Sequence, residues 1–296
     1  MTLLQLHKAN YILSLHPTMT TQTPTQLAFI GGGNMASAII GGLLKSGFTT
    51  QQICVVEPFE AQRDKLRSEL GVQSHAVANE SLAQADLVVW AVKPQTFKEA
   101  AAACAPHVRL ALHLSVAAGI RASSIAQWMG LDAEQARIVR AMPNTPALVG
   151  LGMSGLYAMP AVRAADRALV EQVLAPTGQV QWFEQEQQLD AVTAMSGSGP
   201  AYVFFFIEAM MEAGQTMGLS AEQSRQLAIQ TFIGASELAR ASSDSPSELR
   251  AKVTSKGGTT HAAITSMEAA GMKALFIAAL QAAQHRAKEL GDEFGK

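Results

Sequence analysis

The feature that most constrains the fold is a glycine-rich turn between a short apolar run and a helical run near the N-terminus. The run LAFI starts at Leu27 and is typical of a buried strand, and Gly31, Gly33 and Ala36 form G-x-G-x-x-A directly after it. The first glycine permits a tight turn, the second lets a pyrophosphate approach the backbone, and the alanine allows helix and strand to pack closely. The start of the helix presents free N–H groups to an anion. This segment predicts a dinucleotide-binding turn.

Strand-like and helical runs alternate along the chain after this turn. Helical runs follow at 35–47, 60–70 and 96–105. The strand-like runs are LAFI (27–30), ICVVE (53–57), ADLVVWAV (85–92), LALHLSVAAG (110–119) and QVQWFE (179–184), with less regular strands in RIVRAMPNTPALVG and MSGLYAM. Alternation of this kind predicts right-handed βαβ units, and unbroken apolar strands indicate a sheet covered on both faces. We therefore expect a Rossmann-type, doubly wound parallel sheet.

Only helices are expected in the C-terminal part. Ser198 precedes a proline and is expected to open a helix as its N-cap. Ser220 with Gln223, and Ser245 with Glu248, form capping boxes. Several of these helices are apolar around most of their circumference, so another surface must cover them. A second subunit is the natural cover, and we expect a homodimer.

These patterns divide the chain into three parts. We expect a disordered extension over residues 1–24, a dinucleotide-binding domain over 25–188 and an all-helical substrate and dimerisation domain over 189–296. The extension holds neither a sustained apolar core nor a small-residue cleavage site, which argues against a secretory signal.

Composition excludes several classes of function. The net charge is -2 without acidic or basic blocks, so nothing favours nucleic-acid binding. The sequence contains no run of about 18 apolar residues, so it predicts no membrane span. The seven histidines are scattered without ligand spacing, which predicts no metal site. Cys54 and Cys104 are the only cysteines, both in apolar surroundings, and such a pair is typical of buried thiols in a reducing cytoplasm.

Glu57 ends the second strand-like run about twenty residues after Ala36, where a ribose ligand is expected. A carboxylate there accepts hydrogen bonds from an adenosine ribose and repels a 2′-phosphate, which favours NADH over NADPH. Against this, Pro58 could turn the side chain away, and Arg63 or Lys65 could reach a phosphate. An exposed glutamate at a strand end is the structural alternative.

Several segments together resemble pyrroline-5-carboxylate reductases. They are FIGGGNMASAI, AVKPQ, VAAGI, RAMPNTPALVG, SGSGPAYVF and VTSKGGTT, in order between about Leu27 and Leu290. Many dehydrogenases share the glycine motif, whereas the MPNTP, SGSGPAY and S-x-G-G-T-T segments are far more specific. The resemblance implies hydride transfer from NADPH or NADH to the C=N bond of 1-pyrroline-5-carboxylate, giving L-proline in the last step of proline biosynthesis. It also implies helical domains interleaved in a dimer, and larger rings of dimers occur in the family.

The resemblance maps site residues onto this chain. The expected cofactor contacts are Gly31, Gly33, Asn34, Met35, Glu57, Asn79, Ala91, Val92, Lys93, Pro94, Ala117, Ala118 and Gly119. The expected substrate contacts are Ser255, Gly257, Gly258 and Thr259, with Thr260 as the catalytic residue beside the imine nitrogen. The alternative for Lys93 is a solvated loop lysine.

The substrate loop suits a small cyclic imino acid. The Ser255 hydroxyl and backbone N–H groups at a helix start form an anion site for the carboxylate, although plain helix capping would use the same residues. A threonine hydroxyl is too weak an acid to protonate the imine, so Thr260 is expected to orient and polarise it. His261 could relay a proton or be a surface residue. Lys256 stands where the family usually has proline, which removes a stiff position and adds a cation near the substrate carboxylate.

Two other functions remain compatible with this pattern. One is a related reductase, either a β-hydroxyacid dehydrogenase or an imine reductase for another substrate. β-Hydroxyacid dehydrogenases depend on a lysine in the helical domain that acts as general acid. In this chain the S-x-G-G-T-T motif stands at the expected substrate site instead. The other is a dinucleotide-binding oligomer without catalytic activity, which would require a spoiled substrate loop.

Overall fold

The computed structural model describes residues 24–108 and 110–295. The extension expected over residues 1–24 therefore lies outside the described residues, apart from Pro24.

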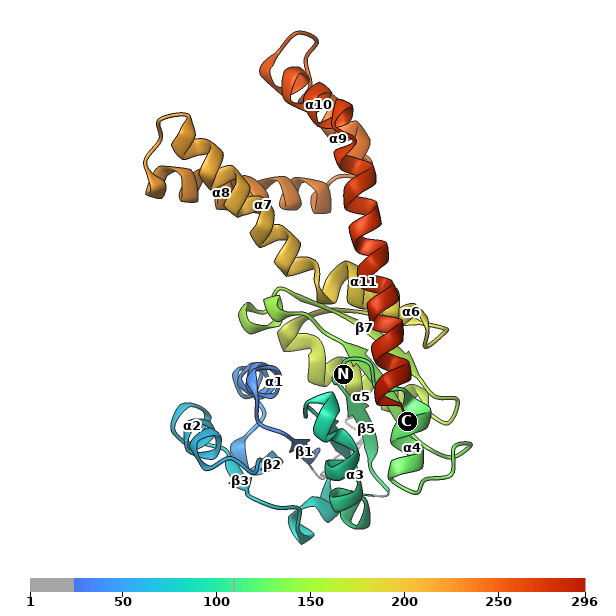
Figure 1. The fold of residues 1–296 in the computed structure, drawn as a ribbon. Coiled ribbons are helices and arrows are strands. Elements are labelled where there is room, and N and C mark those ends of the chain that lie inside the picture. The colour runs from blue at the N-terminus through green and yellow to red at the C-terminus, as the bar shows by residue number, and fades with distance from the viewer. Residues whose placement is uncertain (1–23, 109, 296) are drawn as a thin grey trace, which may run out of the picture.

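One sheet forms the centre of the N-terminal part (Figure 1), and its strand order is β3-β2-β1-β4-β5-β6-β7-β8. The strands are β1 Leu27–Ile30, β2 Ile53–Val56, β3 Gln73–His75, β4 Leu87–Trp90, β5 Leu112–Ser115, β6 Ile138–Met142, β7 Gly152–Ala158 and β8 Gly178–Phe183. The register of the central pairs places Phe29 beside Val55 on one side and Val89 on the other. The order reverses at β1, as expected of a doubly wound sheet.

Two details of the sheet differ from the prediction. β7 pairs antiparallel with β6, and β8 runs parallel to β7, so only β1 to β6 are all parallel. Residues 143–151 connect β6 to β7, which is shorter than the crossover that a parallel return needs. The second difference is β3, whose sequence QSH carries no apolar signal and was not predicted.

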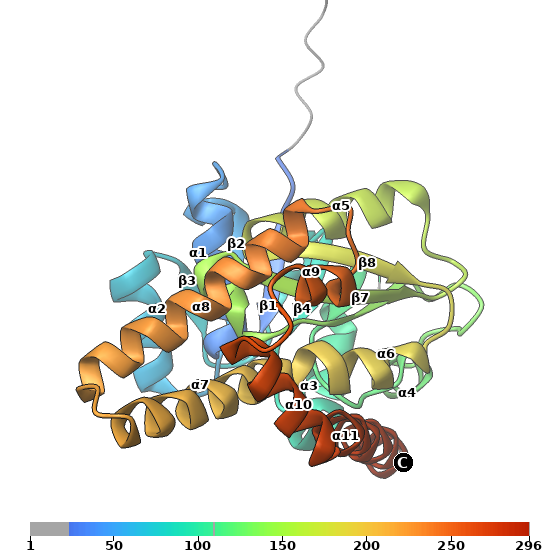
Figure 2. The same cartoon turned by 90° about the horizontal axis from the view of Figure 1, so that it is seen from above.

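Helices cover both faces of the sheet (Figure 2). The helices of this part are α1 Asn34–Lys45, α2 Glu60–Leu70, α3 Pro94–Val108, α4 Ala122–Trp128 and α5 Ala164–Leu174. α1, α2 and α5 bury Ile39, Leu66 and Val170 in one core cluster, while α3 and α4 bury Phe97 and Ile125 in the other. Burial on both faces explains why these strands carry apolar residues without alternation, and it confirms the doubly wound architecture.

The rest of the chain is helical. The helices are α6 Gln188–Val192, α7 Gly199–Thr216, α8 Ala221–Ala241, α9 Pro246–Lys252, α10 Thr259–Ala269 and α11 Met272–Phe294, with a π-helical turn, η5, at Thr193–Gly197. Both predicted capping boxes are present, because Ser220 accepts from the N–H of Gln223 and Ser245 from that of Glu248. Ser198 occupies the predicted N-cap position of α7, with Pro200 in the first turn, but it does not cap the helix with its hydroxyl. Its N–H donates to the Thr193 carbonyl, so the helix runs on from α6 through η5.

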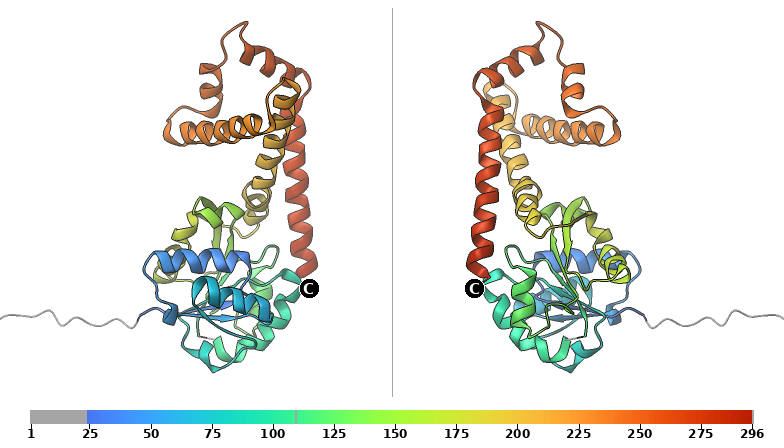
Figure 3. Two further views of the ribbon diagram at one scale, coloured as in Figure 1. Left: turned by 90° about the vertical axis from the view of Figure 1, so that its left-hand side faces the viewer. Right: turned by 90° about the vertical axis from the view of Figure 1, so that its right-hand side faces the viewer.

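The helices α7 to α11 project from the sheet as an arm (Figures 1 and 3). α11 runs back along the arm, and its C-terminal end returns to the sheet domain, where Ser124 Oγ donates to the Gly295 carbonyl at 3.2 Å. The arm leaves many large apolar side chains exposed in the single chain. They include Val203, Phe204, Phe205, Met210, Met217, Leu227, Ile233, Leu238, Leu275, Phe276 and Ile277.

Exposed apolar surface on this scale marks an interaction site. Among the described residues, no single helix is long and apolar enough to cross a bilayer; α10 and α11 together reach that length and composition as a pair bent by 56°.

Candidate cofactor and substrate sites

The strand order places most of the predicted cofactor segments along one edge of the sheet. Glu57 follows β2, the glycine turn follows β1, Ala91–Pro94 follows β4 and Val116–Gly119 follows β5. These strands are parallel neighbours, so their carboxyl ends meet at the same edge. Open α/β sheets bind ligands at this edge, beside the point where the strand order reverses.

The glycine turn has the geometry that its sequence predicts. Gly31 has a φ of 91°, and a Cβ there would lie 2.6 Å from the carbonyl oxygen of Ala91. Only glycine fits this position. Gly33 is the N-cap of α1, and a Cβ on it would meet nothing within 4 Å. The open space above Gly33, together with the N–H groups of Asn34 and Met35 in the first turn of α1, suits a pyrophosphate.

Glu57 is buried beneath the glycine turn, with 6% of its surface exposed. Its Oε2 accepts from the Gly32 N–H at 2.8 Å and its Oε1 from the Phe59 N–H at 2.9 Å. The alternative of an exposed strand-end glutamate is therefore wrong. Gln62 also donates to the Gly32 carbonyl, so side chains from the β2 end and α2 hold both backbone groups of Gly32. The predicted contact of Glu57 with the ribose stays a prediction.

Asn79 and Lys93 flank this edge in short turns. Asn79 caps a 3-10 turn at Glu80–Gln84 by accepting from the Ser81 N–H at 2.9 Å, which leaves its amide NH₂ available to a ligand. The Lys93 side chain is exposed, and its backbone carbonyl accepts from the N–H and hydroxyl of Thr96. The exposure agrees with a solvated loop lysine, and the predicted contact of Lys93 with the cofactor stays a prediction.

The turn after β5 contacts the helical arm. Gly119 has a φ of 76°, and a Cβ there would lie 3.5 Å from the backbone of Leu290 and from the Phe294 ring in α11. The neighbouring Ala117 is buried and Ala118 half-buried. The segment expected beside the nicotinamide is therefore also the segment on which the C-terminal helix rests.

Asn144 joins two of the family-specific motifs, and sequence reasoning assigned it no role. Its Nδ2 donates to Ser196 Oγ at 3.0 Å, and its Oδ1 accepts from the Met153 N–H at 2.9 Å. Asn144 lies in MPNTP after β6, whereas Ser196 lies in SGSGP within η5. The two motifs form one joint between the carboxyl edge and the start of α7. The only sign of this contact in the sequence was that both motifs are specific to the family that the chain resembles.

Two ion pairs fasten α6 and the turn that precedes it to the sheet, and the sequence did not predict them. Arg121 binds both carboxylate oxygens of Asp190, at 3.0 and 3.2 Å, and Arg140 Nη1 lies 2.8 Å from Glu186 Oε1. The Glu186 oxygen also accepts from the Ala122 N–H at 2.7 Å. Burial lowers the pKa of the Arg140 guanidinium, and the nearby Glu186 carboxylate acts in the opposite direction by favouring the charged form. The partners are far apart in sequence, so no local pattern pairs them.

The predicted substrate loop lies between α9 and α10 at the far end of the arm (Figures 1 and 3). Gly257 has a φ of 78°, and Gly258 is the N-cap of α10 without a side-chain capping bond. Capping of α10 by the Ser255 hydroxyl, the structural alternative, is therefore wrong. Thr259 and Thr260 are the first two residues of α10, so their N–H groups are free for a ligand.

Within one chain the structure does not bring the substrate loop to the cofactor edge. α10 leads directly into α11, whose 23 residues return to the sheet domain. At 1.5 Å per residue, α11 is roughly 34 Å long. The loop is separated from its own glycine turn by about the length of this helix.

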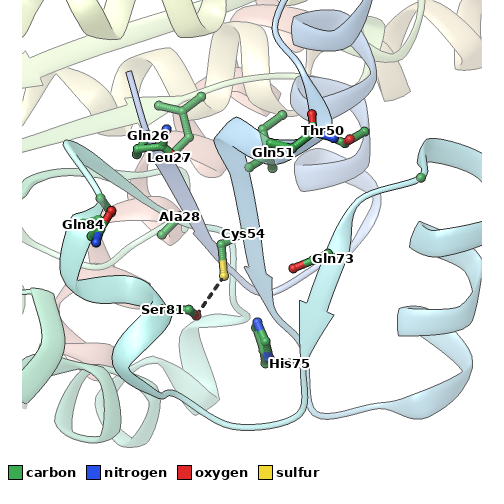
Figure 4. Close-up of a pocket in the computed structure, with 13 residues that line it drawn as sticks. Gln26, Leu27, Ala28, Thr50, Gln51, Cys54, Gln73, His75, Ser81 and Gln84 are labelled. Atoms are coloured by element: carbon green, nitrogen blue, oxygen red, sulfur yellow. Dashed lines mark hydrogen bonds between the residues drawn. The ribbon is translucent and has the colours of Figure 1, made fainter. Parts of the chain in front are cut away.

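A cavity of about 400 Å³ lies at the opposite, amino-terminal edge of β1, β2 and β3 (Figure 4). Cys54, His75 and Ser81 line it with several glutamines, and Cys54 Sγ lies 3.3 Å from Ser81 Oγ. Cys104 is buried as expected, but Cys54 is only half-buried because it borders this cavity. Burial raises the pKa of both thiols, that of Cys104 to about 11.

No group of three or more metal-ligating side chains occurs among residues 24–108 and 110–295.

Comparison with known proteins decides the family. Residues 186–290 match the model of the pyrroline-5-carboxylate reductase dimerisation domain, and residues 26–119 match that of the coenzyme F420-dependent NADP oxidoreductases. The pyrroline-5-carboxylate reductase of Pseudomonas aeruginosa is 44% identical over 272 residues, which cover 92% of this chain and 98% of the relative. The chain belongs to the pyrroline-5-carboxylate reductase family.

Solved structures of the family agree with this fold. The pyrroline-5-carboxylate reductase of Coxiella burnetii superposes with a TM-score of 0.83 at 38% identity, covering 90% of this chain and 99% of that one. The Plasmodium falciparum enzyme, solved with NADP bound, superposes with a TM-score of 0.80 at 28% identity, covering 90% and 98%. Both the sheet domain and the helical arm are therefore features of the family.

Proposed function

We propose that this protein reduces the C=N bond of 1-pyrroline-5-carboxylate to L-proline with NADPH or NADH. The observation that carries the proposal is the loop from Ser255 to Thr260, which ends at the uncapped start of α10 in a chain whose sheet edge has the geometry of a dinucleotide site. Membership of the family supports the reaction class. It disfavours a β-hydroxyacid dehydrogenase and an oligomer without activity.

The loop offers the groups that the reaction needs. The free N–H groups of Thr259 and Thr260 and the Ser255 hydroxyl bind the substrate carboxylate at a helix N-terminus. Thr260 donates a hydrogen bond to the imine nitrogen and so orients the ring. Hydride then passes from the nicotinamide C4 to the imine carbon over about 3–3.5 Å. The neutral nitrogen takes its proton from water as hydride arrives, because a threonine hydroxyl holds its proton too tightly. If the imine is already protonated when it binds, the Thr260 hydroxyl oxygen accepts a hydrogen bond from its N–H instead.

A second copy of the chain completes the site in this proposal. The loop and the glycine turn of one chain are separated by about the 34 Å length of α11, and hydride transfer needs contact. The apolar side chains exposed on α7, α8 and α11 would be covered by the arm of a partner. Two arms that interleave bring the loop of one subunit over the cofactor edge of the other. We propose a cytoplasmic homodimer, with rings of dimers as a further level of assembly.

Replacement of Thr260 by alanine tests the function. We expect a fall in turnover of roughly ten- to hundredfold, less than the largest effects of a true general acid. The measurement follows NADH and NADPH oxidation with the pyrroline carboxylate. Thr259→Ala serves as the neighbouring control, because it keeps the backbone N–H that is assigned to the substrate carboxylate. Wild-type protein that binds cofactor but reduces no pyrroline carboxylate would refute the reaction, and an unaltered turnover in Thr260→Ala would refute this role.

Replacement of Glu57 by serine tests the cofactor side. The buried carboxylate lies where a ribose is expected, and its charge opposes a 2′-phosphate. We therefore expect Glu57→Ser to shift the ratio of kcat/KM values towards NADPH. The substitution also removes two hydrogen bonds within the turn. We therefore expect kcat/KM to fall with both cofactors, in addition to the shift in their ratio. An unchanged ratio would contradict a ribose role for Glu57.

A further inference from the structure

A guanidinium lies at the adenosine end of the cofactor edge. Arg63, in the second turn of α2, reaches back to the end of β2, where its Nη1 donates to the carbonyls of Glu57 at 2.9 Å and Pro58 at 2.7 Å. These bonds hold the side chain half-buried against the turn that follows Glu57. It is the turn beside which the ribose of a dinucleotide lies in this fold.

The remaining donors of Arg63 are available. A guanidinium has five N–H groups in a planar fork, and both bonds to the carbonyls come from one nitrogen. Among the residues that the structure describes, Nε and Nη2 have no partner. Such a fork matches the oxygens of a phosphate with two parallel hydrogen bonds.

Most charged groups beside Arg63 are already paired, so its positive charge is available to an anion. The Glu57 carboxylate points inward and accepts from the N–H groups of Gly32 and Phe59, which spread its charge. Arg67, one turn further along α2, is paired with Asp64 at 3.1 Å. Glu60, in the first turn of α2, is the remaining carboxylate close in sequence. Arg63 is thus a cation held at the end of β2 by hydrogen bonds to backbone carbonyls.

We infer that Arg63 binds the 2′-phosphate of NADPH and gives this site its affinity for the phosphorylated cofactor. The inference rests on the dinucleotide site proposed above and refines it. Glu57 and Arg63 act against each other: the buried carboxylate favours an unmodified ribose, and the guanidinium favours a phosphorylated one. The cofactor preference of the enzyme is the balance of the two.

Binding of adenosine fragments tests the inference without turnover. The dissociation constants of 2′,5′-ADP, 5′-ADP, NADPH and NADH are measured by calorimetry for the wild type, Arg63→Gln and Arg67→Gln. Loss of a charged hydrogen bond weakens binding by roughly ten- to hundredfold. We expect that loss for 2′,5′-ADP and NADPH in Arg63→Gln only, with 5′-ADP and NADH within about twofold of the wild type.

Three results would overturn the inference. They are an equal loss for phosphorylated and unphosphorylated ligands in Arg63→Gln, no loss for either, or the same loss in Arg67→Gln. The first would make Arg63 a structural support of α2. Arg63→Lys keeps the cation without the planar fork, and a partial recovery of 2′,5′-ADP affinity over Arg63→Gln is expected. None of these measurements needs the imine substrate. They therefore test the role of Arg63 even if the protein does not catalyse the proposed reaction.

Discussion

Heterodimers that join one Thr260→Ala subunit to one Gly33→Glu subunit are expected to reduce the pyrroline carboxylate, although each parent homodimer is impaired. Gly33→Glu suits the cofactor-deficient parent, because the space beside Gly33 is open in the fold and the new carboxylate would meet the pyrophosphate. If the loop of one subunit serves the cofactor edge of the other, one of the two sites in the heterodimer holds an intact edge and an intact loop. We expect roughly half of the wild-type turnover from such a dimer of two equivalent sites.

The measurement uses two affinity tags, so that only mixed dimers are assayed. The matched control places both substitutions in one subunit and pairs it with a wild-type subunit. A site shared between subunits predicts that each site in this control is defective, whereas a site within one subunit predicts half of the wild-type turnover. A first heterodimer no more active than its parents would contradict the shared site.

Loss of one partner of the buried Arg140–Glu186 pair is expected to destabilise the protein strongly. The Arg140 side chain is 5% exposed and the Glu186 side chain 17%, so removal of either leaves the other charge with little water. Breaking a buried pair in this way costs about 3–5 kcal/mol, whereas replacing both partners by apolar residues is often neutral. We expect Arg140→Met to be among the most destabilising substitutions in the sheet domain. Arg140→Met with Glu186→Leu is expected to recover only part of the loss, because the Ala122 N–H then lacks its acceptor.

Urea unfolding at one fixed protein concentration measures this effect, because the stability of a dimer depends on concentration. Arg240→Ala is the control, since the Arg240–Glu237 pair is 68% and 55% exposed and such pairs contribute about 0–1 kcal/mol. If Arg140→Met lowers the free energy of unfolding no more than Arg240→Ala, the ion pair is not what fastens α6 to the sheet.

Much of the fold could be predicted because many of its signals are local. The glycine turn, the strand-like runs and the capping boxes at Ser220 and Ser245 each lie within a few residues, and the structure contains them all. Ser198 shows the limit of such signals. A serine before Gly-Pro is typical of a helix start, yet α6 and η5 precede it and continue into α7, so its hydroxyl is not needed as a cap.

The reaction class came from motifs, and the structure explains why these motifs are specific. Asn144, in the loop after β6, is hydrogen-bonded to Ser196, in the π-helical turn η5, although the two residues are far apart along the chain. Gly119 has a φ of 76°, which favours glycine, and its backbone packs beside α11, a contact that belongs to the fold of this chain. Residues chosen by resemblance therefore include some that serve the joint between the domains.

By itself, the sequence determined which segments are strands and helices over most of the chain and where the glycine turn lies, and it predicted which loop binds the substrate. These depend on residues that are neighbours along the chain, whose steric and hydrogen-bonding preferences act without the rest of the fold. Only the tertiary structure decided that Glu57 lies buried under Gly32, that β7 reverses, and that Arg140 meets Glu186. It also decided that the predicted substrate loop is separated from the predicted cofactor edge of the same chain by about the length of α11. Such contacts join residues distant in sequence, and their energy arises only when the packed chain excludes water between them.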